Sequence, residues 1–267
     1  LWRVEDGAIV GSTHGVTIEN NTFLVYRKEE VGNFHLKLDF KLQGDSNSGI
    51  MYRAKDIEGL ANGLSGPQLD IHPKEEYLGM YYSEKTGRGI VAQRGQKVLV
   101  PEELDAKGKS TPKITGKVGN DEGFNVFHWN EYEIIAVGNR LIHKINGVIT
   151  VDVNDRFPGA DKEGLIGLQL HKGPAMLAFA KNIQLKRLNG KEGQAAIRAA
   201  TADNKKRDRA PDPLEGKAMN ENRATPRNRI TSKPGFEVDL LYSVPGDQQG
   251  SWVNLCTDNK GRILVSD

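Results

Sequence analysis

Leu141-Ile-His-Lys-Ile-Asn-Gly-Val-Ile-Thr-Val151 is the stretch that decides the fold class. Apolar and β-branched residues dominate on both sides of its central Asn146-Gly147 pair, as in β-strands. Asn and Gly tolerate the positive φ angles that both central residues of a type I′ turn require. The stretch therefore predicts a hairpin of two antiparallel strands.

Short runs of the same kind recur on both sides of this hairpin, from residue 1 to about residue 188. Turn-forming residues separate them, and almost none shows a sustained helical period. Besides the hairpin, the runs are Gly7 to Val10, Thr22 to Arg27, Phe34 to Leu42, Gly49 to Arg53, Gln68 to Ile71, Gly79 to Tyr82, Tyr132 to Val137, Leu165 to His171 and Ala175 to Leu188. So many strands in one segment predict an all-β sandwich, with Val100 to Gly123 as a long polar loop beside its working face.

Four segments end a strand-like pattern in side chains that suit sugar binding: Asn47-Ser-Gly-Ile-Met-Tyr-Arg53, Gln68-Leu-Asp-Ile-His72, Trp129-Asn-Glu-Tyr132 and Gly167-Leu-Gln-Leu-His171. Side chains alternate between the two faces of a strand. The alternation predicts one polar face that carries Met51 with Arg53, Gln68 with Asp70 and His72, and Gln169 with His171. The apolar residues between them would form the core face.

Composition excludes several classes of protein. The 267 residues include 37 basic and 35 acidic side chains, and this near balance gives no sustained field for binding nucleic acid. No apolar run approaches the roughly 18 residues of a membrane span. The single cysteine, Cys256, cannot form an intrachain disulfide, and its apolar context predicts a small buried hydrophobe.

The character of the chain changes after residue 188. We predict a charged linker over 189–233, helical over part of Glu192 to Lys206 and ended by Pro211 and Pro213. Order should return over 234–267, where strand-like runs predict the truncated start of a β-propeller blade. A lone blade cannot bury its own faces, so we expect the natural chain to continue beyond Asp267.

Residues 1–188 resemble the 3-keto-disaccharide hydrolase family, also described as 3-keto-glucoside 1,2-lyases and 3-keto-2-hydroxyglucal hydratases. The order and spacing of the landmarks carry the resemblance: Trp2 with Glu5-Asp-Gly7, Asn21-Thr-Phe-Leu24, Phe34-His-Leu-Lys-Leu38, Asn47-Ser-Gly-Ile50, Gln68-Leu-Asp70, Gly79-Met-Tyr-Tyr82, Trp129-Asn-Glu-Tyr132, Asn146-Gly147 and Gly164-Leu-Ile-Gly-Leu-Gln-Leu-His171. The resemblance implies a concanavalin-like jelly roll of two antiparallel sheets. Residues 235–267 resemble the start of a propeller-type sugar dehydrogenase region in large multidomain bacterial proteins.

These resemblances imply a carbohydrate-active enzyme that cleaves 3-keto-glycosides by removal of the C2 proton, elimination at C1 and hydration, with net hydrolysis. The implied partner is the downstream propeller domain of the same chain, and the implied location is the bacterial periplasm or cell surface. The alternative is a noncatalytic carbohydrate-binding jelly roll that serves a downstream oxidoreductase, because a fold does not fix an activity.

Elimination requires a base, a donor at the enolate oxygen and an acid for the departing oxygen. His171 is the first candidate for base or acid, with an exposed strand-end histidine as the alternative. Asp70 is either the partner base, a metal ligand or half of a salt bridge with Arg53. The planar guanidinium of Arg53 suits an oxyanion. Asn47, Gln68, Gln169 and Tyr82 are candidates for binding hydroxyl groups.

A divalent metal held by Asp70 with His72 and His143 is a further candidate, although no spacing typical of metal ligands supports it and the alternation places His143 toward the core or the hairpin surface. Trp2, Trp129 and Tyr132 fit the core better than a sugar platform. Tyr81, Tyr82 and Phe124 are the candidates for sugar stacking. The Glu-x-Asp-x-x-Glu run of jelly-roll glucanases is absent from the sequence, which disfavours ordinary retaining hydrolysis.

Overall fold

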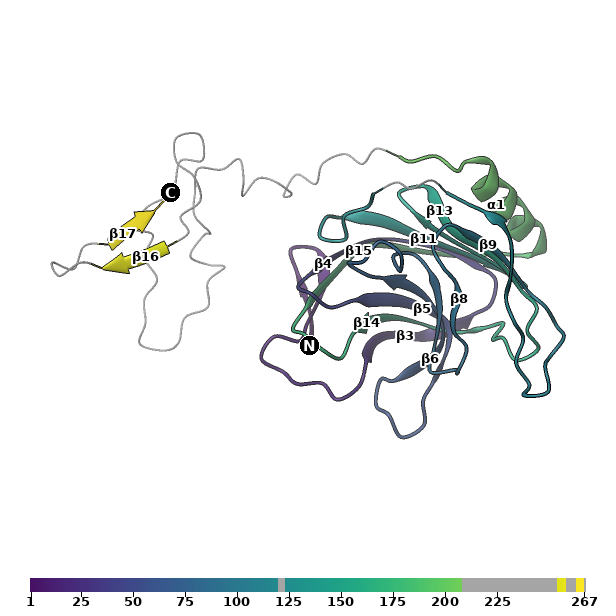
Figure 1. The fold of residues 1–267 in the computed structure, drawn as a ribbon, viewed down its shortest axis with the longest axis horizontal. Helices are drawn as coiled ribbons and strands as arrows, with labels where there is room; N and C mark the ends of the chain where they lie inside the picture. The colour runs from purple at the N-terminus through teal and green to yellow at the C-terminus, as the bar shows by residue number, and fades with distance from the viewer. Residues whose placement is uncertain (120–122, 208–253, 258–262, 267) are drawn as a thin grey trace. The chain divides into compact units, whose positions relative to one another are not determined.

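The computed structural model of the chain describes residues 1–119, 123–207, 254–257 and 263–266 (Figure 1). Two compact units are distinguished, Leu1–Arg209 and Ala210–Asp267. The first unit is a sandwich of two β-sheets with one helix, which confirms the predicted all-β jelly roll.

A nine-stranded sheet has the order β1-β2-β15-β4-β11-β12-β13-β9-β10. Its strands are β1 (Trp2–Glu5), β2 (Ala8–Ser12), β15 (Leu177–Arg187), β4 (Phe34–Gln43), β11 (Asn130–Val137), β12 (Arg140–Ile145), β13 (Val148–Asp155), β9 (Gln96–Val100) and β10 (Lys113–Lys117). Neighbouring strands are antiparallel except β13 and β9, which are parallel. This pair departs from the prediction of purely antiparallel sheets, because the chain crosses from β8 in the other sheet to β9.

A six-stranded antiparallel sheet has the order β3-β14-β5-β6-β7-β8. Its strands are β3 (Thr22–Val31), β14 (Gly164–Leu170), β5 (Ser48–Asp56), β6 (Leu64–Ile71), β7 (Tyr81–Glu84) and β8 (Gly89–Ala92). Alternate residues of the two sheets meet between them and exclude water. The main core includes Leu36, Leu38, Phe40, Ile50, Tyr52, Leu69 and Ile71.

The hairpin that decides the fold class forms as predicted. Asn146 and Gly147 have φ angles of 47° and 84°, and they join the antiparallel pair β12–β13. The side chain of Asn146 also accepts a hydrogen bond from the backbone N–H of Glu131, at 2.9 Å. The turn is therefore tied to the neighbouring strand β11.

The stretch from Val100 to Gly123 is not wholly a loop. It contains β10, which pairs with β9 at the edge of the nine-stranded sheet, whereas the polar working face lies on the six-stranded sheet. The run of Lys, Gly and Thr in β10 lacks the apolar alternation of a buried strand, and the side chains of its first three residues are exposed. Edge strands need only one partner, so a weak pattern suffices there.

Helix α1 (Gly190–Ala202) lies within the Ala-rich part of the sequence that follows β15. Asn189 and Glu192 form a capping box at its N-terminus, which satisfies backbone N–H groups that the helix leaves unpaired. Ala200 and the neighbouring apolar side chains of α1 pack on Ile135, Val137 and other outward residues of the nine-stranded sheet. The helix thus covers part of the outer face of this sheet (Figure 1).

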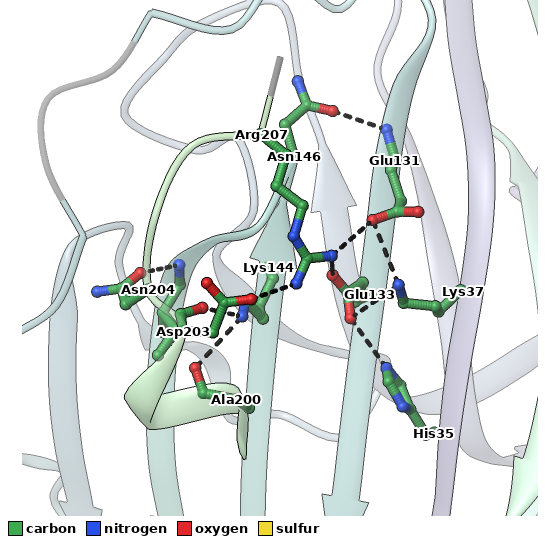
Figure 2. Close-up of polar contacts among 11 residues, drawn as sticks. His35, Lys37, Glu131, Glu133, Lys144, Asn146, Ala200, Asp203, Asn204 and Arg207 are labelled. Atoms are coloured by element: carbon green, nitrogen blue, oxygen red, sulfur yellow. Dashed lines mark hydrogen bonds and ion pairs between the residues drawn. The ribbon is translucent and has the colours of Figure 1, made fainter. Parts of the chain in front are cut away.

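Polar contacts extend this packing to residue 207 (Figure 2). Lys144 donates to the carbonyl oxygens of Ala200 and Asp203, at 3.2 and 2.7 Å. Arg207 donates from its backbone to Asn146, at 2.8 Å, and its guanidinium lies 3.4 Å from a carboxylate oxygen of Glu133. The segment after the helix is therefore fastened to the jelly roll.

In the second unit, β16 (Asn254–Thr257) and β17 (Ile263–Ser266) form an antiparallel pair. The other predicted strand of this region, Phe236 to Tyr242, lies outside the described residues, as do the predicted linker beyond residue 207 and the rest of the predicted propeller blade. No described helix is long and apolar enough to cross a membrane.

Glu133 should make the stability of the first unit sensitive to acid. Burial alone would raise its pKa, but the hydrogen bond from His35 and the charges of Lys37 and Lys144 outweigh burial and lower the pKa from 4.5 to about 2. A carboxyl with a lowered folded-state pKa stabilises the fold above its unfolded-state value, and this contribution is lost as the pH falls through the folded-state value. The contribution is on the order of 3 kcal/mol.

We expect the free energy of unfolding of the wild type to fall between pH 4.5 and about 2, and Glu133→Gln to lack this part of the fall. Urea unfolding at a series of pH values measures both. Glu131→Gln is the matched control, since Glu131 lies on the same strand with a more exposed side chain. Identical pH dependence in wild type and Glu133→Gln would contradict the assignment.

Candidate functional site

The polar face of the six-stranded sheet contains a pocket of roughly 240 Å³ at the ends of β6 and β14. Six of the seven predicted site residues line it: Asn47, Gln68, Asp70, Tyr82, Gln169 and His171. They come from β6, β7 and β14 and from the residues next to β5 and β14, so segments far apart in the sequence meet here. Strand alternation brings Gln68 and Asp70, and Gln169 and His171, to one face, as the sequence indicated.

Two buried amides form a chain that ends on a carboxylate. Gln169 donates to the side-chain oxygen of Gln68, at 3.1 Å, and Gln68 donates to Asp70, at 2.7 Å. All three residues are at least 97% buried. The side-chain oxygen of Gln169 has no hydrogen-bond partner among the described residues. A buried acceptor without a partner is costly.

Asp70 lies at the inner end of this chain. Burial raises its pKa to about 7, and the negative charge of Glu84 adds to the increase, whereas hydrogen bonds from Gln68 and Asn47 oppose it. Desolvation disfavours the charged form of a carboxyl, so the ionised form is a stronger base than in water. Asp70 can therefore exchange a proton near neutral pH.

Two histidines lie at the mouth of the pocket. Burial lowers the pKa of His171 and also that of His72, so both imidazoles are neutral at neutral pH. Nδ1 of His72 accepts a hydrogen bond from the backbone N–H of Lys74, at 2.9 Å, and its ring contacts that of Tyr77. In a neutral imidazole that accepts at one nitrogen, the other carries the proton. Each neutral histidine can thus donate one hydrogen bond.

Glu84 is a carboxylate of the pocket that our sequence analysis missed. It is 7% exposed and accepts a hydrogen bond from the side-chain nitrogen of Asn21, at 3.2 Å. The side-chain oxygen of Asn21 in turn accepts a hydrogen bond from the backbone N–H of Lys172, at 2.9 Å. Glu84 lies two residues after Tyr82, so alternation along β7 could have found it. Tyr77 and Met80 also line the pocket, but they belong to a loop without a periodic pattern.

Arg53 does not lie in the pocket, and it forms no pair with Asp70. The pairing of β5 with β6 shifts register between Met51 and Lys55, and Arg53 itself has a φ of 48°. A bulge changes the face on which a side chain lies. The guanidinium is 99% buried and donates to the carbonyl oxygens of Gly32 and Gly138, at 2.9 and 2.8 Å. The simple alternation failed because it assumed an unbroken strand.

The structure also places the remaining aromatic and histidine candidates. Tyr132 is fully buried, as predicted, whereas Trp129 is only partly buried beside Lys41 and Lys181. Tyr81 is not a stacking platform, since it is buried and donates to Asp155, at 3.0 Å. His143 lies in the core with its Nε2 2.8 Å from the hydroxyl of Tyr52.

The described residues contain no group of three or more His, Cys, Asp or Glu side chains arranged to hold a metal ion. His143 is separated from the pocket by its burial in the core, so the ligand set of Asp70, His72 and His143 does not form.

Replacing Arg53 tests its structural placement. Arg53→Ala leaves two carbonyl oxygens without their charged donor, and we expect a loss of roughly 3 kcal/mol in the free energy of unfolding. Turnover per folded molecule should not change. Denaturant unfolding and kinetics below the melting temperature measure these two effects. Arg27→Ala, which removes an exposed ion pair with Asp56, is the control and should alter neither. If Arg53→Ala lowers turnover but not the free energy of unfolding, Arg53 acts in the site and the structural assignment is wrong.

Three solved structures are similar to this chain. A protein provisionally called a glycosyl hydrolase, from Parabacteroides distasonis, has 21% identity and a TM-score of 0.46, with 70% of this chain and 84% of that chain covered. The carbohydrate-binding module CBM66 of Bacillus subtilis has 14% identity and a TM-score of 0.46, over 70% and 91%. A Bacillus subtilis protein of unknown function with a galectin-like fold has 11% identity and a TM-score of 0.41, over 70% and 88%.

No curated protein matches this chain in sequence. The family assignment comes instead from a family model, that of the 3-keto-alpha-glucoside-1,2-lyase-like domain, which matches residues 1–186. This range covers nearly the whole jelly roll and every residue that lines the pocket. The chain therefore belongs to the 3-keto-alpha-glucoside-1,2-lyase-like family, whose members are carbohydrate-active domains.

Proposed function

We propose that the pocket binds a 3-keto-glucoside and that Asp70 removes the proton from C2. The observation that carries the proposal is that one pocket is lined by both Asp70, which burial gives a pKa of about 7, and the partly buried, neutral imidazole of His171. Enzymes that remove a proton next to a carbonyl commonly combine a carboxylate base with a neutral histidine that polarises the carbonyl. Family membership supports the choice of a 3-keto sugar.

The ketone at C3 makes the C2 proton acidic. In the proposed first step, the carboxylate of Asp70 takes this proton and the electron pair moves to the C3 oxygen, which becomes an enolate oxygen. His171 donates a hydrogen bond to that oxygen as its charge develops. The enolate then collapses, C1 and C2 become doubly bonded, and the C1–O bond breaks. The departing oxygen takes a proton from solvent.

Water then adds to C1 of the unsaturated product, which completes a net hydrolysis. Gln169 has a role in binding, because it lines the pocket and its amide chain to Gln68 holds Asp70. Asn47 and Tyr82 are further donors and acceptors at the wall of the pocket. Arg53 has no role in this scheme, since it lies in the bulge of β5.

One substitution at Asp70 and one at His171 test the proposed roles of these two residues. We expect Asp70→Asn to lower kcat by about 10²- to 10⁴-fold, the usual worth of a general base. His171→Leu, which has no hydrogen-bond donor, should lower it by about 10²- to 10³-fold through the loss of a donor to the enolate. Release of the C1 leaving group measures turnover of a 3-keto-glucoside, because hydration consumes the conjugated enone. Asp105→Asn and His14→Leu, on exposed residues outside the pocket, are the matched controls.

Activity that survives both substitutions would overturn the site. Tight sugar binding by a wild type that shows no turnover would instead favour the carbohydrate-binding module. Circular dichroism and melting temperature would show that the variants remain folded.

The pH dependence tests the role of Asp70 as a base. The base must be ionised, so kcat/KM should rise with pH through a limb near 7. Glu84→Gln removes a negative charge that raises the pKa of Asp70, and the limb should therefore move to lower pH. Glu131→Gln, on the opposite sheet, should leave the limb in place. If the limb does not move in Glu84→Gln, the charge of Glu84 does not raise the pKa of Asp70.

A further inference from the structure

The oxygen that departs from C1 needs a proton, and its place in the pocket follows from the roles of Asp70 and His171. Both residues line the same pocket. C1 and C3 are the two ring neighbours of C2, on opposite sides of it. With C2 at Asp70 and the C3 oxygen at His171, the C1 oxygen therefore lies on the side of Asp70 that is away from His171.

The order of the strands shows which residues lie on that side. His171 follows β14, and β5 separates β14 from β6, which carries Asp70. On the other side of β6 lies β7, where Tyr82 pairs with Gln68. Neighbouring strands of a sheet are about 4.8 Å apart. Asp70 therefore lies between His171 and Tyr82 across the sheet, and Tyr82 is on the C1 side.

Tyr82 has a hydroxyl group that is available to a substrate. The residue lines the pocket, and its hydroxyl makes no hydrogen bond with any other described residue. Its neighbour across the strands is the apolar Ile90, which is 41% exposed and also lines the pocket. Burial raises the pKa of Tyr82, and the charges of Glu84 and Asp70 raise it further. The phenol therefore keeps its proton at neutral pH.

Two other polar groups of the lining fit the role of proton donor less well. Glu84 also lies on β7, but its negative charge acts on Asp70, so the ionised carboxylate has no proton to give. His72 lies close enough to His171 for the charge of one to lower the pKa of the other, which places it on the C3 side of Asp70. Tyr82 is thus the best placed donor on the C1 side.

We propose that Tyr82 is the general acid of the elimination and gives its hydroxyl proton to the oxygen that leaves C1. The inference rests on the proposed function and replaces solvent in this one step. As the C1–O bond breaks, its electron pair goes to the departing oxygen, which takes the proton of Tyr82. Asp70 then carries the C2 proton and passes a proton to the phenolate, which is the stronger base. Both residues thereby regain their starting forms.

Two substrates with different leaving groups test the proposal. Methoxide needs a proton to depart, whereas 4-nitrophenolate is stable as an anion. In the full chain, Tyr82→Phe should therefore lower kcat for methyl 3-keto-glucoside by about 10²- to 10⁴-fold and leave kcat for 4-nitrophenyl 3-keto-glucoside within about threefold of the wild type. Release of methanol and of 4-nitrophenol measures turnover. Tyr26→Phe is the matched control, since Tyr26 is 38% exposed and lies outside this pocket.

Exchange of the hydrogen at C2 gives a second readout. In deuterium oxide, Tyr82→Phe should still remove the C2 proton of methyl 3-keto-glucoside, so that recovered substrate carries deuterium at C2 while methanol is released slowly. Asp70→Asn should show neither exchange nor release beyond the rate without protein. NMR spectra of the recovered substrate measure the exchange.

Equal losses of kcat for both leaving groups, or no loss for either, would overturn the role of Tyr82 and leave the proposed function standing. Loss of C2 exchange in Tyr82→Phe would have the same consequence, because Tyr82 would then act before the elimination. If the wild type releases neither methanol nor 4-nitrophenol, the proposed function and this inference fail together.

Discussion

Burial of apolar side chains between the two sheets is the constraint on which the rest of the structure depends. Ile50, Leu69 and Leu168 take the inner side of β5, β6 and β14, and their neighbours along each strand must then face outward. This places Gln68, Asp70 and Gln169 on one outer face. The polar site is therefore a direct consequence of how the core is packed.

The same burial sets the chemistry of the pocket. Removal of water raises the pKa of Asp70 and lowers that of His171, so that a base and a neutral donor coexist near pH 7. Glu84 strengthens the first effect, and the amide chain from Gln169 holds the carboxylate in place. Desolvation is thus the main cause of both pKa shifts, and no Lys or Arg side chain lines the pocket.

Contacts outside the two sheets hold the loop before β7 and helix α1 on the sandwich. The loop that ends in Gly79 joins the backbone of Asp70 to Thr150 of the opposite sheet. On the outer face of the nine-stranded sheet, α1 and Arg207 are held by Lys144 and Glu133 (Figure 2). Both features depend on contacts between residues more than 50 positions apart.

The sequence by itself determined the sandwich, the type I′ hairpin at Asn146-Gly147 and the shared face of Gln68, Asp70, Gln169 and His171, because these follow from local turn chemistry and a two-residue period. Only the tertiary structure decided the position of Arg53, since a bulge interrupts the alternation within β5. It likewise decided that β7 lies beside β6, which brings Glu84 into the pocket with Asp70. These placements depend on which strands are neighbours and on how an irregular loop packs, and periodicity along one strand contains neither.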